Sequence, residues 1–260
     1  MTETGHTENG KPGKVALVGA GPGDPSLLTL KGKAYIEKAD CIIYDRLVSQ
    51  ELLHYASSGC ELIYAGKEDR HHTFSQDEIN ALLYVKAKEK NCVVRLKGGD
   101  PYVFGRGGEE ALYLLERGIK AEIVPGISSC LAVPLYAGIP VTHRGVSNGI
   151  HIVSAHWPER IDYEALLDPE ITYVFLMGLF GIEEIVKRLM EAGRDPGTPV
   201  AVISDGTTRK QRICIACLKT IADKVKKEGL RPPGIIVVGN VVALSEKLDP
   251  FGIAGNGPYD

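Results

Sequence analysis

The sequence predicts an α/β protein built from two α/β domains, each a β-sheet covered by helices. Apolar, β-branched runs alternate with helical patterns along nearly the whole chain, an order that is typical of parallel sheets with helices on both faces. The 260 residues also exceed the usual size of one domain. Finally, the turn VPGISS at 124–129 and a loop rich in Gly and Pro at 138–149 separate two such series.

The first series predicts a parallel sheet. Its strands are short apolar runs, and each following helix is expected to begin at a Ser or Gly, the residue types that suit a helix start. The expected strands are 14–20, 41–45, 61–66, 92–100 and 121–126. The expected helices begin at Ser26, near Ser49, at Ser75, at Gly107 and at Ser128.

The second series predicts a mixed sheet, because its last three strands are close together with one clear helix among them. Its expected strands are 151–156, 172–178, 199–206, 212–218 and 234–244, with helices after Gly181 and after Lys219. We place the domain boundary near Val124. The predicted organisation is a disordered tail at 1–13, an N-terminal domain at 14–123, a C-terminal domain at 124–248 and a second tail at 249–260.

Composition excludes several classes of partner. Hydrophobic and charged fractions of 44% and 24% are ordinary for a globular protein, and a net charge of −3 gives no general attraction to nucleic acid or acidic membranes. No apolar run approaches the roughly 20 residues that span a bilayer, and the polar start lacks the apolar core of a signal peptide. We therefore expect a cytoplasmic protein with no nucleic-acid or membrane partner.

The six cysteines are scattered along apolar segments, which fits a reducing compartment. Cys214 and Cys217 form a Cys-x-x-Cys spacing, but no second Cys or His pair is near them. In a strand, this odd spacing also directs the two sulfurs to opposite faces. We expect no metal site.

The glycine loop after the first strand, VGAGPGDPSLLTLKG, is similar to a dinucleotide fingerprint, and Asp45 closes the second strand where a ribose-binding acid would lie. However, Gly23 follows Gly21 after one residue where the fingerprint needs two. Pro22 and Pro25 also lack the N–H groups that bind a pyrophosphate. The loop suits a ligand without phosphate, such as S-adenosylmethionine; the alternative is a plain glycine turn into a helix capped by Ser26.

A second glycine loop, RLKGGDPYVFGRGGEE at 95–110, leaves another strand of the same series. Gly98 and Gly99 allow close approach of the backbone to a ligand, Asp100 offers a carboxylate and Pro101 stiffens the turn. Neighbouring parallel strands place their C-terminal loops on one side of a sheet, so we expect the two glycine loops to form one cleft.

These two loops, taken with YAGK, HHTFSQDEIN, VPGISS, GIPVTHRG and PGIIVVGNVVALSEKL in this order, resemble the tetrapyrrole methylases over about residues 14–248. Within that family they resemble the branch that methylates uroporphyrinogen III. The resemblance implies a homodimer of two-domain α/β chains, with S-adenosylmethionine as methyl donor in the cleft between the domains. It implies two methyl transfers, to carbons 2 and 7 of uroporphyrinogen III, giving precorrin-2 for sirohaem and cobalamin synthesis.

The resemblance also implies which residues contact S-adenosylmethionine. They are Pro22, Gly98, Gly99, Asp100, Val103, Ser128, Ser129, Met177 and Gly206. The family often has Thr-Ala where this chain has the two serines. Without the resemblance, the local sequence suggests other roles for four of them. Met177 would be a core side chain, Gly206 a hairpin residue, Ser128 a helix cap and Asp100 a turn residue.

Attack by a pyrrole carbon on the methyl group leaves a cationic ring, so a base that takes a ring proton would help. The resemblance implies Asp45 as this base and Lys67 as a proton donor or a charge that steadies a carboxylate; alternatively, Asp45 caps a turn and Lys67 is a surface charge. The substrate carries eight carboxylates, which need local cations. We expect Arg46, Arg106 and Arg144 to bind them, unless they are solvated or paired with a local acid.

Glu109 and Glu110 lie near the start of a helix, where the dipole favours acids, and we interpret them as structural. Three other functions stay open at this point. A sister methylase would act on another acceptor, a nicotinamide dehydrogenase would transfer hydride, and a non-catalytic sensor would bind S-adenosylmethionine without turnover.

Overall fold

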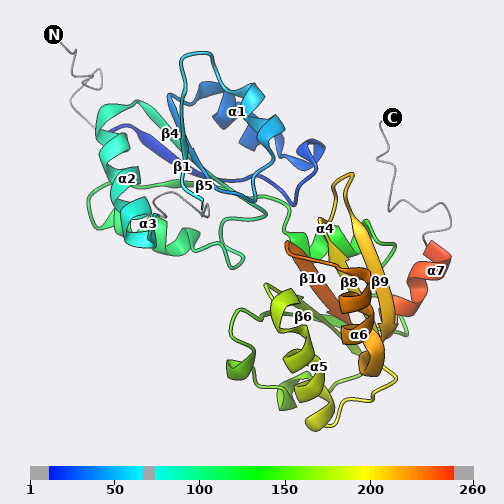
Figure 1. Ribbon diagram of the computed structural model, residues 1–260. Helices are drawn as coiled ribbons and strands as arrows, with labels where there is room; N and C mark the ends of the chain where they lie inside the picture. Colours follow the sequence, from blue (N-terminus) through cyan, green and yellow to red (C-terminus); the bar gives the residue numbers. More distant parts are fainter. Residues whose placement is uncertain (1–11, 67–73, 249–260) are drawn as a thin grey trace. The chain divides into compact units, whose positions relative to one another are not determined.

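The computed structural model describes residues 12–66 and 74–248, and the chain divides into two compact units after Ser128 (Figure 1). Each unit contains its own five-stranded sheet, which confirms the predicted fold class. The sequence placed the boundary near Val124. In the structure Val124 ends a strand that pairs with the first strand of the chain, so it belongs to the first unit.

The sheet of the first unit is parallel throughout, with strand order β3-β2-β4-β1-β5. Its strands are mainly apolar, as expected for a sheet that helices cover on both faces. They are β1 (Lys14–Gly19), β2 (Cys41–Tyr44), β3 (Glu61–Tyr64), β4 (Cys92–Lys97) and β5 (Glu122–Val124). Since all pairings are parallel, the carboxyl ends of all these strands lie at one edge.

Alternate residues of β1 enter two separate cores, one on each face of this sheet. Val15 and Leu17 pack in a cluster with side chains of α2 (Gln76–Glu89) and α3 (Gly107–Leu115). Ala16 and Val18 pack with Ile36 of α1 (Leu30–Lys38) and with Leu52 of the 3₁₀ turn Gln50–Tyr55. The period of two along the strand therefore builds a doubly covered sheet.

Two expected helix starts differ from the structure. Ser26 does not cap α1, because its N–H and hydroxyl both donate to Asp24 Oδ1, at 2.8 and 2.7 Å, within a 3₁₀ turn, Pro25–Leu27. Thr29 caps α1 instead, accepting the Gly32 N–H at 3.0 Å. The segment near Ser49 forms a 3₁₀ turn rather than an α-helix.

The start of α2 follows the prediction at Ser75, which forms a reciprocal capping box with Glu78. Ser75 Oγ accepts the Glu78 N–H at 3.3 Å, and Glu78 Oε2 accepts the Ser75 N–H at 2.7 Å. We expect Ser75→Ala to lower the free energy of unfolding by about 1 kcal/mol, since one helix N–H loses its acceptor. Urea denaturation measures this change. Ser58→Ala, on an exposed turn, is the control and should change stability by less than about 0.5 kcal/mol; equal midpoints for both variants would contradict the prediction.

The sheet of the second unit is mixed, as expected, with strand order β6-β7-β10-β8-β9. β6 and β7 pair in parallel and the other pairs are antiparallel. The strands are β6 (Gly149–Ser154), β7 (Ile171–Leu176), β8 (Pro199–Ser204), β9 (Arg212–Cys217) and β10 (Gly234–Val238). The last strand is shorter than the predicted 234–244, because the chain turns at Gly239, where φ is 146°, into the 3₁₀ turn Asn240–Leu244 and α7 (Ser245–Leu248).

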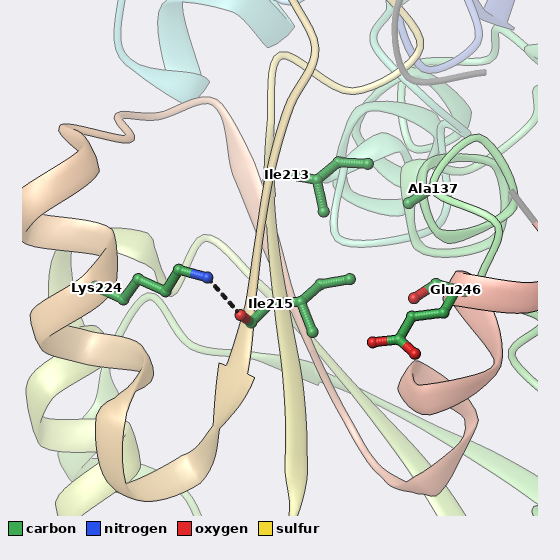
Figure 2. Close-up of a pocket in the computed structure, with 6 residues that line it drawn as sticks. Ala137, Ile213, Ile215, Lys224 and Glu246 are labelled. Atoms are coloured by element: carbon green, nitrogen blue, oxygen red, sulfur yellow. Dashed lines mark hydrogen bonds between the residues drawn. The ribbon is translucent and has the colours of Figure 1, made fainter. Parts of the chain in front are cut away.

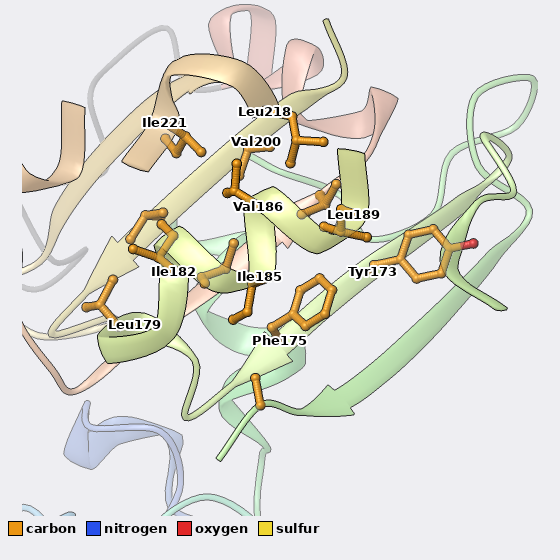
Figure 3. Close-up of a cluster of buried hydrophobic side chains, with 14 of the residues drawn as sticks. Tyr173, Phe175, Leu179, Ile182, Ile185, Val186, Leu189, Val200, Leu218 and Ile221 are labelled. Atoms are coloured by element: carbon orange, nitrogen blue, oxygen red, sulfur yellow. The ribbon is translucent and has the colours of Figure 1, made fainter. Parts of the chain in front are cut away.

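One face of this sheet is covered by α5 (Ile182–Glu191) and α6 (Leu218–Glu228). Figure 3 shows Phe175 of β7 against Ile185 of α5, with Leu218 and Ile221 of α6 in the same cluster. A further helix, α4 (Ser129–Leu135), contacts β7 and β10. Within the described ranges, no helix combines the length and apolar character needed to cross a membrane.

Candidate active site

The two glycine loops of the first unit meet directly at the carboxyl edge of its sheet. Gly21 follows β1 and Gly99 follows β4, and these strands are neighbours. The Gly21 N–H donates to Gly99 O at 3.2 Å, and the Gly99 N–H donates to Gly21 O at 2.7 Å. The structure therefore brings together the two loops that the sequence predicted to form one site.

A third glycine, Gly126 after β5, locks this arrangement. A Cβ added at Gly126 would lie 2.2 Å from Gly99 O, and a Cβ added at Gly19 would lie 2.5 Å from Gly126 Cα. Distances below 3.0 Å are not tolerated by real Cβ atoms. The loops after β1, β4 and β5 therefore pack backbone against backbone, and no other residue type fits at these glycines without moving a loop.

Asp100 joins two of these loops through its carboxylate. Oδ1 accepts the Tyr102 N–H at 2.8 Å, and Oδ2 accepts the Gly126 N–H at 3.0 Å. This is the turn role that the residue type allows, extended by one long-range bond. Contact of Asp100 with a cofactor stays a prediction.

The remaining predicted cofactor residues of the first unit flank the same loops. Pro22 follows Gly21 directly and is half-buried, as is Val103 after Asp100. Gly98 packs against the loop that follows β2, since a Cβ there would lie 2.6 Å from Leu47 Cβ. The carboxyl edge of this sheet thus gathers the glycine loops and the loop that carries Asp45.

Asp45 lies one residue beyond β2, with about a quarter of its side chain (26%) exposed. Its Oδ1 accepts the Leu47 N–H at 3.0 Å, and its Oδ2 accepts a bond from Arg95 Nη2 at 3.2 Å. The carboxylate is therefore held in one orientation, with a guanidinium on one side and solvent on the other. Lys67, its predicted partner, lies outside the described residues.

Three charged residues that the sequence analysis did not assign to the site lie behind Asp45. Arg95 and Lys97 lie two positions apart in β4, so their side chains point to the same face of the sheet. Glu110, in the first turn of α3, contacts both of them. Their side chains are 4%, 5% and 0% exposed. Glu110 Oε1 accepts from Arg95 Nε at 3.2 Å and from Lys97 Nζ at 2.9 Å.

A sequence signal for this cluster exists. Two cations at i and i+2 in a strand that is otherwise apolar and buried require a buried anion, because an unpaired buried charge is costly. Burial, together with the Arg95 cation, lowers the pKa of Lys97 below its usual value. The two neighbouring glutamates differ in burial: the Glu110 side chain is fully buried, whereas the Glu109 side chain is exposed.

Arg106 forms an ion pair with the exposed Glu109. Its Nε and Nη2 donate to the two oxygens of Glu109 at 2.9 and 2.6 Å, and more than half of each side chain is exposed. This is the local pairing that the sequence left open as an alternative. Arg46 and Arg144 are exposed, and neither forms an ion pair within residues 12–66 and 74–248.

In the second unit, Met177 and Gly206 follow strands that end at the same edge. β7 and β8 both flank β10, whose first residues pair with Leu176 and Ser204. Met177 is not a core residue: it lies beyond the strand in a left-handed conformation, with φ 61°, and is 48% exposed. Such a conformation is costly for a non-glycine residue and is concentrated at functional sites.

Gly206 lies between two further left-handed residues, Asp205 at φ 48° and Thr207 at φ 65°. A Cβ at Gly206 would lie 2.4 Å from Val133 Cγ1 of α4, so close packing explains the glycine. Ser129 is the first residue of α4. Ser128 is buried just before it, where the two units divide.

A separate hollow of about 320 Å³ in the second unit is lined by none of the predicted site residues (Figure 2). Ile213 and Ile215 of β9 point into it, and Glu246 of α7 borders it. Lys224 donates to Ile215 O at 2.9 Å from the other side of the strand. We therefore do not assign the chemistry to this hollow.

Comparison with known proteins adds independent information. The family model described as Tetrapyrrole (Corrin/Porphyrin) Methylases matches residues 14–222. A uroporphyrinogen-III C-methyltransferase of Methanocaldococcus jannaschii is 52% identical over 236 residues, which cover 88% of this chain and 97% of that protein. A siroheme synthase of Methylococcus capsulatus is 46% identical over 256 residues, which cover 94% of this chain and 54% of that longer protein.

Solved structures agree with these relatives. The crystal structure of a uroporphyrin-III C-methyl transferase from Thermus thermophilus, complexed with S-adenyl homocysteine, has a TM-score of 0.77 and 41% sequence identity. The likeness covers 89% of this chain and all of that one.

Proposed function

The chain belongs to the tetrapyrrole (corrin/porphyrin) methylases, and within this family we propose that it transfers two methyl groups from S-adenosylmethionine to uroporphyrinogen III. The acceptor atoms are carbons 2 and 7, and the product is precorrin-2, which leads to sirohaem and cobalamin. The observation that carries the proposal is the carboxyl edge of the first sheet, where Asp45 lies beside the interlocked glycine loops. The proposal is supported by the 52% identity to a uroporphyrinogen-III C-methyltransferase.

The glycine loops suit S-adenosylmethionine because they lack a phosphate site. Pro22 and Pro25 remove two N–H donors, and Gly99 N–H and Gly21 N–H already bond to each other's loops. The bound methyl donor supplies a sulfonium, which is an electrophile that needs no metal. We propose that the nine predicted contacts hold it: Pro22, Gly98, Gly99, Asp100, Val103, Ser128, Ser129, Met177 and Gly206.

We assign Asp45 the role of the base. In each transfer the bond from the pyrrole carbon to the methyl group forms while the sulfur–methyl bond breaks, and its electron pair stays on sulfur. The ring then carries one excess positive charge and loses one proton. We propose that the Asp45 carboxylate, which accepts a bond from Arg95 and is partly exposed, stabilises this charge and accepts the proton. Lys67 is proposed as the donor or as a charge that steadies a carboxylate.

The arginines are proposed to bind the substrate's carboxylates. Arg46 adjoins Asp45 in sequence and is exposed, so it can reach a ligand at that edge. Arg144 is exposed in the second unit. Arg106 would have to exchange Glu109 for a substrate carboxylate, which is feasible because exposed pairs contribute little stability.

We also propose a homodimer. Leu112 and Leu115 lie three residues apart on α3 and are 61% and 57% exposed, so one face of this helix presents apolar surface. Light scattering on the purified protein tests this: a mass twice that of the chain is expected, and a mass of one chain at micromolar concentration would contradict it.

The test of the function is an anaerobic assay with uroporphyrinogen III and S-adenosylmethionine, following methyl incorporation and the mass and absorbance of the product. Two methyl groups per acceptor are expected. If the folded protein binds S-adenosylmethionine but transfers no methyl group, the acceptor is another one, and a sister methylase activity becomes the better hypothesis. Absence of methyl transfer to any tetrapyrrole would indicate a sensor.

A further inference from the structure

The buried charge cluster formed by Arg95, Lys97 and Glu110 is connected by hydrogen bonds to Gln76 and to Asp45. Gln76 Nε2, at the start of α2, donates to Glu110 Oε1 at 3.2 Å. The same oxygen accepts from Lys97 Nζ and Arg95 Nε, and Arg95 Nη2 donates to Asp45 Oδ2. A fully enclosed carboxylate is therefore linked to the partly exposed Asp45 through a single guanidinium.

The guanidinium of Arg95 is held on every side. Its Nη1 donates to the carbonyl oxygens of Ile43 at 3.3 Å and Leu96 at 3.1 Å, and its Nε donates to Glu110. A planar guanidinium fixed by three partners presents Nη2 in one direction, toward Asp45. Of these partners, Glu110 is the one that carries charge.

The charges of this cluster and of Asp45 balance. Arg95 and Lys97 contribute two positive charges, and Glu110 and Asp45 contribute two negative charges. Without Glu110 the buried face would hold two cations against the partly exposed Asp45 alone, which is an expensive arrangement. Within the described residues, Glu110 Oε2 has no hydrogen-bond partner, so the carboxylate is held entirely through the oxygen that contacts both cations.

We propose that Glu110 is a positioning residue for methyl transfer: through Arg95 it fixes the orientation of the Asp45 carboxylate. The inference rests on the proposed function, in which Asp45 is the base. A purely structural role of Glu110 would predict something different. Loss of Glu110 would then lower stability, but its effect on kcat would not depend on the presence of Asp45.

The test is a double-mutant cycle on the full chain. Glu110→Gln keeps the shape and one acceptor oxygen but removes the charge. We expect kcat to fall about 10- to 100-fold, as for outer residues that orient reactive groups, with KM for both substrates within about twofold. In the Asp45→Asn background the same change should lower kcat by less than about twofold, because the residue through which it acts is already lost. Equal losses in both backgrounds would overturn the proposal.

Two additions keep this test decisive. Glu116→Gln, an exposed acid at the end of the same helix, is the control and should leave kcat unchanged. If Glu110→Gln does not fold, the double variant Glu110→Gln with Lys97→Met removes one charge of each sign, and it should show the same kcat loss and the same non-additivity. A folded double variant with wild-type kcat would overturn the proposal.

A readout that does not need turnover separates this inference from the proposed function. With ¹³C-labelled aspartate, the carboxyl resonance of Asp45, assigned by its loss in Asp45→Asn, should shift in Glu110→Gln and not in Glu116→Gln. An unchanged resonance would overturn the coupling. A shifted resonance in a wild-type protein that transfers no methyl group would instead show that the coupling exists and that the proposed function is wrong.

Discussion

Asp45→Asn is expected to lower kcat for methyl transfer by about 10²- to 10⁴-fold, the usual contribution of a positioned proton acceptor. The affinity for S-adenosylmethionine should stay within about twofold, because the amide keeps the shape of the carboxylate. Its oxygen can still accept the Leu47 N–H, so the turn after β2 is preserved. Single-turnover rates under anaerobic conditions and calorimetric titration of S-adenosylmethionine measure the two effects separately.

The control for this variant is Asp223→Asn, an exposed position on α6, which should leave both quantities unchanged. A kcat within about threefold of wild type in Asp45→Asn would show that Asp45 serves the turn alone. A parallel loss of S-adenosylmethionine affinity and of stability would also count against the base, since a local collapse would then explain the lower rate.

Gly126→Ala is the second change with a large expected effect, because the added Cβ would lie 2.2 Å from Gly99 O and 2.7 Å from Gly19 Cα. Both neighbours are backbone atoms, so a loop must move. We expect the free energy of unfolding to fall by about 1–3 kcal/mol, the usual cost of overpacking. We expect S-adenosylmethionine affinity to fall by at least about tenfold, since the loop after β4 that is proposed to contact it would shift.

Gly108→Ala, in the second glycine loop at 95–110, is the matched control, because a Cβ there meets no atom within 4 Å and the residue lies in α3. Alanine favours a helix by up to about 1 kcal/mol over glycine, so this variant should be equally or more stable. Urea denaturation and calorimetric titration test both variants. If Gly126→Ala binds S-adenosylmethionine as tightly as Gly108→Ala, the interlocked loops do not form the cofactor site.

Much of the fold follows from local patterns. The strands of both sheets begin where the apolar runs predict them, although β10 ends earlier than predicted, and Ser75 with Glu78 starts α2 as a capping box. Errors fall where two local signals compete. Ser26 and Thr29 are both acceptable caps, but Ser26 donates to Asp24, two residues before it, so the helix begins later than predicted.

The meeting of the two glycine loops was predicted from the sequence, but the bonds that connect them to the rest of the chain were not. Asp100 was expected to contact the cofactor or to serve the turn; the structure shows the turn role and adds a bond from the N–H of Gly126, a residue 26 positions away, while the cofactor contact stays a prediction. Met177 sits in an apolar run that suggests a core position, yet its left-handed backbone places it outside the core. Neither feature has a local sequence pattern.

The sequence by itself determined the α/β class, the order of the strands along the chain, the phosphate-free glycine loops and the family resemblance. These depend on periodicity, on caps and on residue types within a few positions of one another. The tertiary structure alone decided which loops interlock and which charges are enclosed, as with Arg95 and Glu110. The physical reason is that a buried ion pair depends on the order of strands within the sheet and on the helix that covers them.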